Sequence, residues 1–361
     1  MSETGLPELS ALERDPILAG LLGSTPPCMT QEEATGLLQE RFGIDAVLTE
    51  VACERDQNFH VSASDGREYV LKISNPEEAR VTTDFQTQGI LWIERHDPDL
   101  PVPKLVATKG GEYQAPVTLA DGRQSMVRVL TWLQGEPLYK VAITPAIEAA
   151  IGTVLARVGR ALRDFSHDGA KQDLLWDIRH AGRLRPLLHA VPMDAVGRAV
   201  REELAYYEAD VQPRLAALRH QVVHNDLNHH NVMVCPDDTS RITGVIDFGD
   251  MVETCLAIDV AVAASYLADH PVDALGSVSR MIAAYHQVTP LLRTEIELMR
   301  DLIVMRLVTS ITITEWRARR YPENGAYILR NNGPARRAMA GFAALDRNQV
   351  KARLLLACGL E

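Results

Sequence analysis

The sequence contains few aromatic residues and no surplus of positive charge. Phe, Trp and Tyr make up 5% of the 361 residues, which disfavours the aromatic platforms on which single-stranded nucleic acids stack. Acidic residues outnumber basic ones by 48 to 37, which gives a formal net charge of -11. Proteins that bind a phosphate backbone usually present a basic surface. We therefore expect no nucleic-acid partner, and an acidic surface suits a cationic ligand better.

Signals for secretion and membrane insertion are also lacking. The five cysteines are scattered and form no Cys-x-x-Cys pair, a distribution typical of reduced thiols in the cytoplasm. The N-terminus has no basic stretch followed by an apolar run. The apolar run that starts at Ala257 contains Asp259 and is too short to cross a bilayer. These features predict a cytoplasmic protein without a membrane partner.

Three common nucleotide-binding or hydrolase motifs are absent. The sequence has no Gly-x-x-x-x-Gly-Lys-Ser/Thr loop, no Gly-x-Gly-x-x-Gly and no Gly-x-Ser-x-Gly. The P-loop, Rossmann and α/β-hydrolase classes therefore lack the residues that define them.

The pattern of apolar residues changes along the chain. With 46% hydrophobic residues over 361 positions, the chain is long enough for two domains. Short strand-like runs dominate the first part, and long helical patterns follow from about Pro145. We predict an α+β fold, with an N-terminal arm at 1–28, a small antiparallel β domain at 29–130 and a mostly helical domain at 131–361.

The first part of the β domain can be predicted in detail. Thr30 and Glu33 form a capping-box pattern, which predicts a helix that ends near Gly43. In the third predicted strand, Lys72 is on the face opposite the most apolar row of side chains. Strands are expected at 46–52, 59–64 and 67–74, and a second helix at about 82–95.

A short β-rich segment between the long helices, residues 221–249, contains the most informative motif. His224, Asp226 and Asn231 have the His-x-Asp-x-x-x-x-Asn spacing of a kinase catalytic loop. Two apolar strand-like runs follow, and the second leads to Asp247-Phe248-Gly249. Each half of this pattern is weak alone, but the order, spacing and strand context together are specific for a kinase.

Phosphoryl transfer requires the residue types that this segment provides. A carboxylate near the attacking hydroxyl orients it and accepts its proton, which is the role we predict for Asp226. Mg²⁺ prefers oxygen ligands and is usually held by one or two protein groups together with phosphates, which fits Asn231 and Asp247. Asp259 is expected to support the loop structurally. The alternative, that Asp226 and Asn231 only cap a turn, leaves Asp247 and Lys72 unexplained.

The β domain is expected to bind the nucleotide. Lys72 occupies the strand position from which a kinase lysine contacts the phosphates, although an ordinary solvated lysine is the simpler alternative. A kinase orients this lysine with a Glu of the next helix, and the corresponding position here is Gln86. The loop 53–58 has no glycine. Asn58, Arg55 and backbone amides would then contact the phosphates, unless the loop is a plain solvated turn.

Four segments of the sequence resemble one family of small-molecule kinases. They are VLKISN (70–75), HNDLNHHNVMV (224–234), GVIDFGDM (244–251) and YPEN (321–324). Over about residues 30–350 the chain resembles the aminoglycoside phosphotransferase and choline kinase-like family, and within it the hydroxylysine kinase branch. This resemblance implies a protein-kinase-like fold of two lobes, with Mg²⁺ as cofactor and ATP or GTP as phosphoryl donor. It also implies a hinge near Val129, Leu130 and Thr131 that contacts the nucleotide.

The resemblance implies a small, amine-bearing alcohol as acceptor. The leading candidate is 5-hydroxylysine, and the alternatives are an aminoglycoside antibiotic, choline, ethanolamine or homoserine. Residues 250–268 run into an apolar helix and contain no Ala-Pro-Glu segment, which leaves little room for the activation loop of a protein kinase. We therefore expect no protein substrate.

An amino-acid acceptor needs anionic groups for its ammonium and a cation for its carboxylate. Asp250 and Glu253, just past the Asp-Phe-Gly tripeptide, are candidates for the first role. Asp177 beside Trp176 is a third candidate, with a helix cap as the structural alternative. For the carboxylate we predict Arg306, whose guanidinium offers a bidentate fork, unless it pairs with a structural carboxylate.

Two other classes of protein remain as alternatives. A cluster of histidines in the same segment would allow a metal-dependent hydrolase, although no His-Glu-x-x-His motif occurs and the neighbouring valines predict a strand. These histidines are His220, His224, His229 and His230. A nucleotide-binding module without activity is the other alternative, and Gln86 in place of a glutamate is the feature that favours it.

Overall fold

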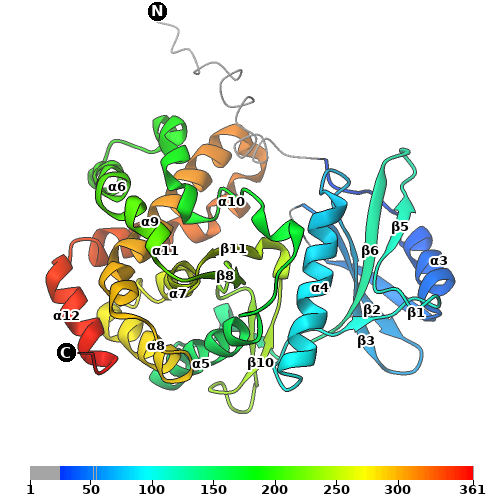
Figure 1. Ribbon diagram of the computed structural model, residues 1–361. Coiled ribbons are helices and arrows are strands. Elements are labelled where there is room, and N and C mark those ends of the chain that lie inside the picture. Colours follow the sequence, from blue (N-terminus) through cyan, green and yellow to red (C-terminus); the bar gives the residue numbers. More distant parts are fainter. Residues whose placement is uncertain (1–24, 52, 54, 361) are drawn as a thin grey trace, which may run out of the picture.

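The computed structural model describes residues 25–51, 53 and 55–360 of the chain. It consists of a strand-rich part and a helix-rich part, and helix α4 lies between them (Figure 1). This arrangement confirms the predicted α+β fold, in which a small antiparallel sheet precedes a mostly helical region. Most of the predicted N-terminal arm at 1–28 lies outside the described residues.

The strand-rich part is built on a six-stranded antiparallel sheet. Its order is β1-β2-β3-β6-β4, with β5 paired to β6. The strands are β1 Ala46–Val51, β2 Gln57–Ala63, β3 Glu68–Ile73, β4 Leu105–Val106, β5 Ala115–Thr118 and β6 Gln124–Thr131. The first three match the predicted strands to within two residues. β5 escapes prediction because its run Ala-Pro-Val-Thr is short and contains a proline, which is unusual inside strands.

Side chains alternate across β3 as the sequence predicts. Leu71 and Ile73 are buried, and Lys72 between them is only partly buried. Antiparallel pairing places Lys72 opposite Asn58 of β2 and Arg128 of β6. Residues paired across strands share one face of the sheet. Lys72 is therefore in one row with Asn58 and Arg128, on the face opposite the apolar row.

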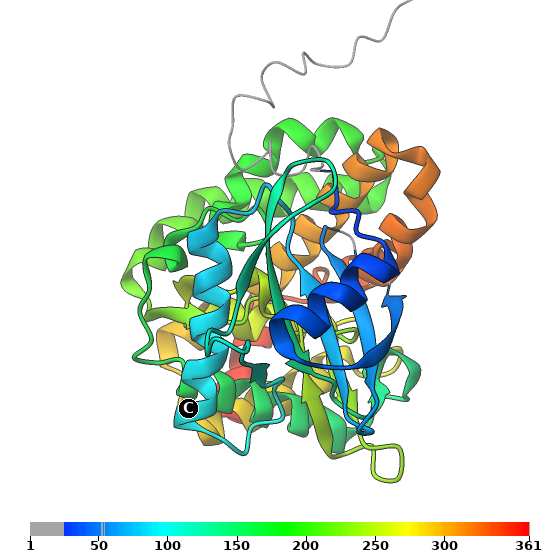
Figure 2. The ribbon, with the colours of Figure 1, turned by 90° about the vertical axis from the view of Figure 1, so that its right-hand side faces the viewer.

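Two helices flank the sheet. α3 (Gln31–Phe42) begins at the predicted capping box, in which Thr30 and Glu33 exchange hydrogen bonds, and it ends at Gly43, where φ is 69°. Figure 2 shows α3 in front of the sheet, with which it forms the smaller of two apolar cores. α4 (Arg80–His96) lies on the other side of the sheet, and its buried side chains belong to the larger core of the helix-rich part. Both predicted helices are confirmed.

The contact between α4 and the helix-rich part requires a glycine. A Cβ atom on Gly89 of α4 would lie 2.6 Å from Cε of Met251 and 3.4 Å from the ring of Phe165. The absence of a side chain lets α4 approach the segment that follows the Asp-Phe-Gly tripeptide. This close approach ties the sheet to the segment that contains the motif.

The helix-rich part surrounds the larger core. Its central helices α7 and α9 are buried over most of their length. The helices are α5 Pro145–Ala161, α6 Ala195–Tyr206, α7 Leu256–Ser265, α8 Ala274–Val288, α9 Arg293–Arg320, α10 Gly325–Ile328, α11 Asn332–Phe342 and α12 Arg347–Ala357. Short helical turns connect them: η1 Leu138–Lys140, η2 Asp168–Lys171, η3 Ile178–Ala190, η4 Tyr207–Val211, η5 Gln212–Ala217, η6 Phe248–Asp250, η7 Pro322–Asn324 and η8 Leu329–Asn331. In the part of the chain that the structure describes, no helix is both long and apolar enough for a bilayer span.

Two small β-sheets position the segment 221–249, which contains the kinase-like motif. β8 (His220–Val223) pairs with β11 (Val252–Cys255), and β9 (Val232–Val234) pairs with both β10 (Ile242–Val245) and β7 (Glu136–Pro137). The predicted catalytic loop connects β8 to β9, and the Asp-Phe-Gly tripeptide connects β10 to β11. The two connections therefore meet at the ends of neighbouring strands, where their side chains come together.

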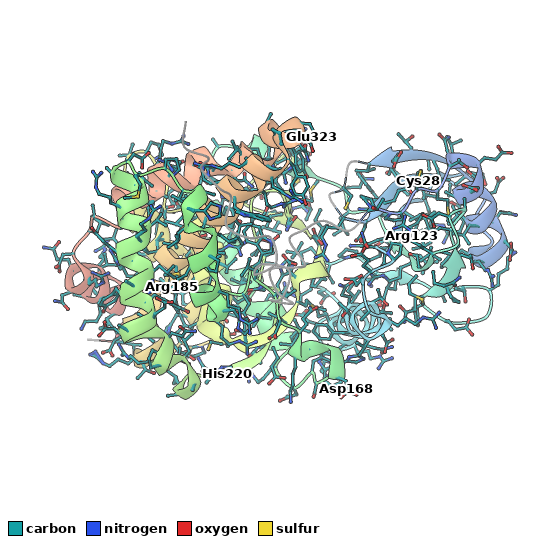
Figure 3. All side chains as sticks on the ribbon, turned by 90° about the horizontal axis from the view of Figure 1, so that it is seen from above. Cys28, Arg123, Asp168, Arg185, His220 and Glu323 are labelled. Atoms are coloured by element: carbon teal, nitrogen blue, oxygen red, sulfur yellow. The ribbon has the colours of Figure 1, made fainter. Side chains whose placement is uncertain are left out.

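The view from above separates the two parts of the molecule (Figure 3). Cys28 and Arg123 lie in the strand-rich part, and Arg185 and His220 lie in the helix-rich part. Asp168 of η2 lies beside α4, with which η2 is in contact. The predicted boundary between the two domains, at 130–131, falls one residue before the end of β6. Because α4 packs into the larger core, the division by residue number stays a prediction.

Candidate active site

The loop between β8 and β9 has an unusual backbone conformation that is stabilised by hydrogen bonds to neighbouring segments. Asn225 adopts a left-handed conformation, with φ of 63°. Its amide donates to Oδ1 of Asp259 over 2.7 Å, which confirms the structural role predicted for that residue of α7. Nδ1 of His224 accepts from the amide of Asp226 (3.2 Å), and Nε2 donates to the carbonyl of Ile246 (3.1 Å). Strained backbone held by several partners is typical of functional loops.

Three donors set the orientation of the Asp226 carboxylate. Nδ2 of Asn228 and Nδ2 of Asn231 each donate to Oδ2 over 2.9 Å. Nη2 of Arg306 donates to Oδ1, also over 2.9 Å. These three hydrogen bonds fix the orientation of the carboxylate predicted to act as base.

The two predicted metal ligands present oxygen atoms next to this carboxylate. Asp247 is the second residue with a left-handed backbone, at φ 64°, and its Oδ1 accepts from the amide of Gly249 over 3.3 Å. Because Nδ2 of Asn231 is engaged by Asp226, the atom of Asn231 left for a ligand is its oxygen. One amide oxygen and one carboxylate suit a hard divalent ion that also binds phosphates. The residues present therefore fit Mg²⁺.

Negative charge accumulates around these residues. Burial raises the pKa of Asp226 above its usual value, the charge of Asp247 raises it further, and Arg306 opposes both. Burial also raises the pKa of Asp250, as do the nearby charges of Asp226 and Asp247. Carboxylates that disfavour one another's ionisation attract a cation, so the site is suited to a positively charged ligand.

Lys72 reaches the same site from the sheet. Burial alone would lower the pKa of its ammonium, but the charges of Asp56 and Asp247 raise it above the usual value. Nζ of Lys72 lies 2.8 Å from Oδ2 of Asp56, and both side chains are largely buried. Lys72 is thus paired with Asp56 and also lies within the electrostatic influence of Asp247.

Of the two possibilities for orienting Lys72, Gln86 or a nearby carboxylate, the described hydrogen bonds do not support Gln86. Oε1 of Gln86 accepts from Nη2 of Arg128 (2.8 Å), and its Nε2 donates to Glu78 (3.0 Å) and to the carbonyl of Gly249 (3.3 Å). None of the hydrogen bonds in the described part of the chain joins Gln86 to Lys72. Arg128 is a lone charged residue in the apolar run SMVRVL, which is a partial signal for a buried polar role. Nothing in the sequence distinguishes Asp56 from the other polar residues of its loop.

The predicted hinge lies too early in the chain. Val129 is fully buried in the smaller core and is paired on both sides, with Leu71 of β3 and Val106 of β4. Neither its side chain nor its backbone is available to a nucleotide, which corrects that prediction. The amide of Thr131 donates to the carbonyl of Lys104, and its Oγ1 accepts from the Lys104 amide. β6 ends at Thr131.

One of the predicted acceptor-binding carboxylates, Asp177, has a structural role instead. Asp177 is fully buried, caps η3 through the amide of Arg179, and accepts from Oγ1 of Thr254. The structural alternative is therefore correct for Asp177. Glu253 is opposite Val222 in the β8–β11 pair. No hydrogen bond or ion pair joins it to the other site residues that the structure describes.

Arg306 lies at the site but is not free to bind a substrate carboxylate. Its side chain is 2% exposed. Its guanidinium carbon lies 5.0 Å from the centroid of the Trp176 ring. Nη1 donates to the Trp176 carbonyl (3.1 Å), and Nη2 donates to Tyr266 Oη (3.3 Å) and to Asp226. The prediction that Arg306 anchors the acceptor is corrected: its partner is the predicted base itself.

The histidines of this segment do not converge. His220 lies on β8 and contacts Sγ of Cys255 (3.2 Å), whereas His224 is turned toward Ile246. Among the described residues, no group of three His, Cys, Asp or Glu side chains forms a metal-binding cluster. The valines between the two histidines form a strand, which confirms the argument made against the hydrolase alternative.

This arrangement of loop, tripeptide and strand lysine defines a phosphotransferase with a protein-kinase-like fold. The sequence matches the model of the phosphotransferase enzyme family over residues 49–293, and the chain belongs to this family. It is an enzyme that transfers a phosphoryl group from a nucleotide to a hydroxyl of a small molecule. The alternative of an inactive module loses its one supporting feature, since Lys72 has a carboxylate partner in Asp56.

The chain is similar to curated hydroxylysine kinases along most of its length. It is 25% identical to that of Danio rerio over 342 residues, which cover 91% of this chain and 95% of the relative. It is 27% identical to that of Xenopus laevis over 331 residues, which cover 85% and 88%. The resemblance to the hydroxylysine kinase branch is thus confirmed.

Solved structures with the same fold include other small-molecule kinases. An amicoumacin kinase in complex with AMP-PNP and Ca²⁺ is 15% identical, with a TM-score of 0.62 over 84% of this chain and 91% of that one. A microcompartment-associated aminopropanol kinase is 16% identical, with a TM-score of 0.59 over 91% and 98%. At these identities the likeness establishes the fold and not the substrate.

Proposed function

We propose that the protein is a Mg²⁺-dependent kinase that transfers the γ-phosphoryl group of ATP or GTP to a hydroxyl of an amino alcohol or hydroxy amino acid, with 5-hydroxylysine as the leading acceptor. The observation that carries this proposal is the Asp226 carboxylate, held by Asn228, Asn231 and Arg306 beside Asp247. The extensive similarity to hydroxylysine kinases supports the choice of acceptor.

Each group has a distinct chemical task in this proposal. Asp226 accepts the proton of the acceptor hydroxyl, and its three donors keep it aligned with that hydroxyl. Asn231 and Asp247 would hold Mg²⁺, which supplies charge neutralisation at the phosphates. Lys72 binds the phosphates from the sheet side. Asn58 is paired with Lys72 across the strands, and its buried Oδ1 has no hydrogen-bond partner, so we assign it to the nucleotide as well.

We propose that the amine of the acceptor binds at Asp250, the carboxylate of the site that has no hydrogen-bond partner among the described residues. Asp250 is close enough to Asp226 and Asp247 for their charges to raise its pKa, and no hydrogen bond of the described residues engages its side chain. An ammonium placed there would relieve this repulsion. Since Arg306 is paired with Asp226, its charge does not argue against a polycationic sugar as acceptor. Arg55, whose charge acts on Asp250, is the cation that remains for an acceptor carboxylate or a phosphate.

A nucleotide-consumption screen tests this proposal directly. The purified enzyme is incubated with Mg²⁺ and either ATP or GTP, and with 5-hydroxylysine, homoserine, threonine, choline, ethanolamine or kanamycin. We expect turnover with 5-hydroxylysine, and removal of Mg²⁺ by a chelator should abolish it. Turnover with kanamycin alone would instead place the protein among the antibiotic-modifying members of the family and contradict the proposed acceptor.

Substitution of Asp250 tests the amine site. Asp250→Asn should raise KM for the acceptor by about 10- to 100-fold, because a charge-assisted hydrogen bond to a buried group is lost. KM for the nucleotide should change little. Asp238→Asn, an exposed aspartate in the turn between β9 and β10 that bonds to Ser240, is the matched control. An acceptor KM that responds to Glu253→Gln and not to Asp250→Asn would contradict the assignment.

A further inference from the structure

The carboxylate that contacts Lys72 comes from the loop before β2 and not from helix α4. In a protein kinase, a glutamate of the helix after the lysine strand orients this lysine. Here Asp56, immediately before β2, takes that place. We propose that Asp56 is the positioning residue for Lys72, and that α4 does not take part in orienting the lysine. This inference rests on the proposed function, because that function gives Lys72 its role at the phosphates.

Asp56 is clamped to the end of β3 through both of its oxygens. Oδ2 lies 2.8 Å from Nζ of Lys72, and Oδ1 accepts from the amide of Asn75 over 2.9 Å. Nδ2 of Asn75 in turn donates to the carbonyl of Arg55 over 2.8 Å. The Asp56 and Lys72 side chains are 14% and 19% exposed. The pair is therefore shielded from solvent. An ion pair exposed to solvent would contribute little to stability.

The polar side chains of α4 and of the segment before it have other partners. Gln86 is engaged by Arg128, Glu78 and the Gly249 carbonyl. Burial and the charge of Asp56 raise the pKa of Glu78, and the charge of Lys72 opposes this rise. Oε1 of Glu78 accepts from Nε2 of Gln86. In protein kinases a displacement of the helix separates the glutamate from the lysine. A displacement of α4 here would leave the pair of Lys72 and Asp56 intact, since Lys72 lies on β3 and Asp56 lies in the loop that leads into β2.

A double-mutant cycle tests whether Asp56 acts through Lys72. Asp56→Asn keeps the oxygen that accepts from Asn75 and removes the charge that faces Lys72. We expect it to lower kcat/KM for ATP by roughly 10- to 100-fold. The effect is measured with 5-hydroxylysine as acceptor, and separately as hydrolysis of ATP without any acceptor. In the Lys72→Ala background, Asp56→Asn should have almost no further effect, because its partner is gone.

The controls separate this role from a structural one. Asp121→Asn removes an exposed ion pair with Arg123 in the turn between β5 and β6 and should leave kcat/KM unchanged. Gln86→Ala should cost less than Asp56→Asn, and its effect should persist in the Lys72→Ala background.

The possible outcomes distinguish the inference from the proposed function. A loss from Asp56→Asn that is undiminished in the Lys72→Ala background would overturn the inference, because Asp56 would then act through the fold. No loss from Asp56→Asn, with a large loss from Lys72→Ala, would overturn the inference and leave the proposed function standing. No loss from Lys72→Ala would overturn both. Activity without acceptor keeps the test informative even if 5-hydroxylysine is not the acceptor.

Discussion

Replacing Asp226 by asparagine is expected to lower kcat by about 10²- to 10⁴-fold, which is the usual contribution of a general base. Binding of the Mg²⁺–nucleotide complex should change little, because Asp226 faces the acceptor in the proposed mechanism. The measurement is kcat with saturating acceptor and nucleotide, together with Kd for the nucleotide from calorimetry. A variant that binds nucleotide normally and does not turn over would identify the base.

The asparagine variant is preferable to an alanine variant because of Arg306. Asp226→Ala would leave the guanidinium of Arg306 buried without its carboxylate, and breaking a buried pair in this way costs about 3–5 kcal/mol of the free energy of unfolding. An asparagine retains an acceptor for Nη2 of Arg306. Thermal unfolding of both variants would measure this difference, with Asp238→Asn as the surface control. Near-normal kcat in a folded Asp226→Asn enzyme would contradict the assignment of the base.

The residues that could be predicted from the sequence are those whose geometry is set locally. Asp226 and Asn231 share one loop, and Asp247 follows the adjacent hairpin, so the short strands bring the three together. Lys72 could be placed because the period of a strand assigns it to one face. In each case the position of the side chain follows from residues close to it in the sequence.

The residues that could not be predicted depend on contacts between distant parts of the chain. Arg306 is 80 positions from Asp226, and its orientation toward the base depends on how α9 packs. Gln86 is 42 positions from Arg128, a pair that forms only once α4 lies against the sheet. Val129 shows a related difficulty: both edges of β6 are paired, and β4 is too short for its pairing to be evident in the sequence.

Replacing Asp247 by asparagine should lower activity by more than about 100-fold, because loss of a direct metal ligand exceeds the 10- to 100-fold typical of groups that only support a ligand. The substitution keeps the backbone, since asparagine tolerates the left-handed conformation at φ 64°. It also keeps an oxygen for the Gly249 amide. What it removes is the negative charge that faces the metal and Lys72.

The dependence of activity on Mg²⁺ concentration distinguishes Asp247→Asn from Asp226→Asn. Asp247→Asn should raise the Mg²⁺ concentration needed for half-maximal activity, because an amide oxygen binds a hard dication more weakly than a carboxylate does. Asp226→Asn should lower kcat without that shift. Titration of Mg²⁺ at a fixed, saturating nucleotide concentration measures both. If the two variants had the same Mg²⁺ requirement as the unmodified enzyme, Asp247 would not be a metal ligand. If both variants raised the required Mg²⁺ concentration equally, the assignment of Asp226 as base and Asp247 as metal ligand would be wrong.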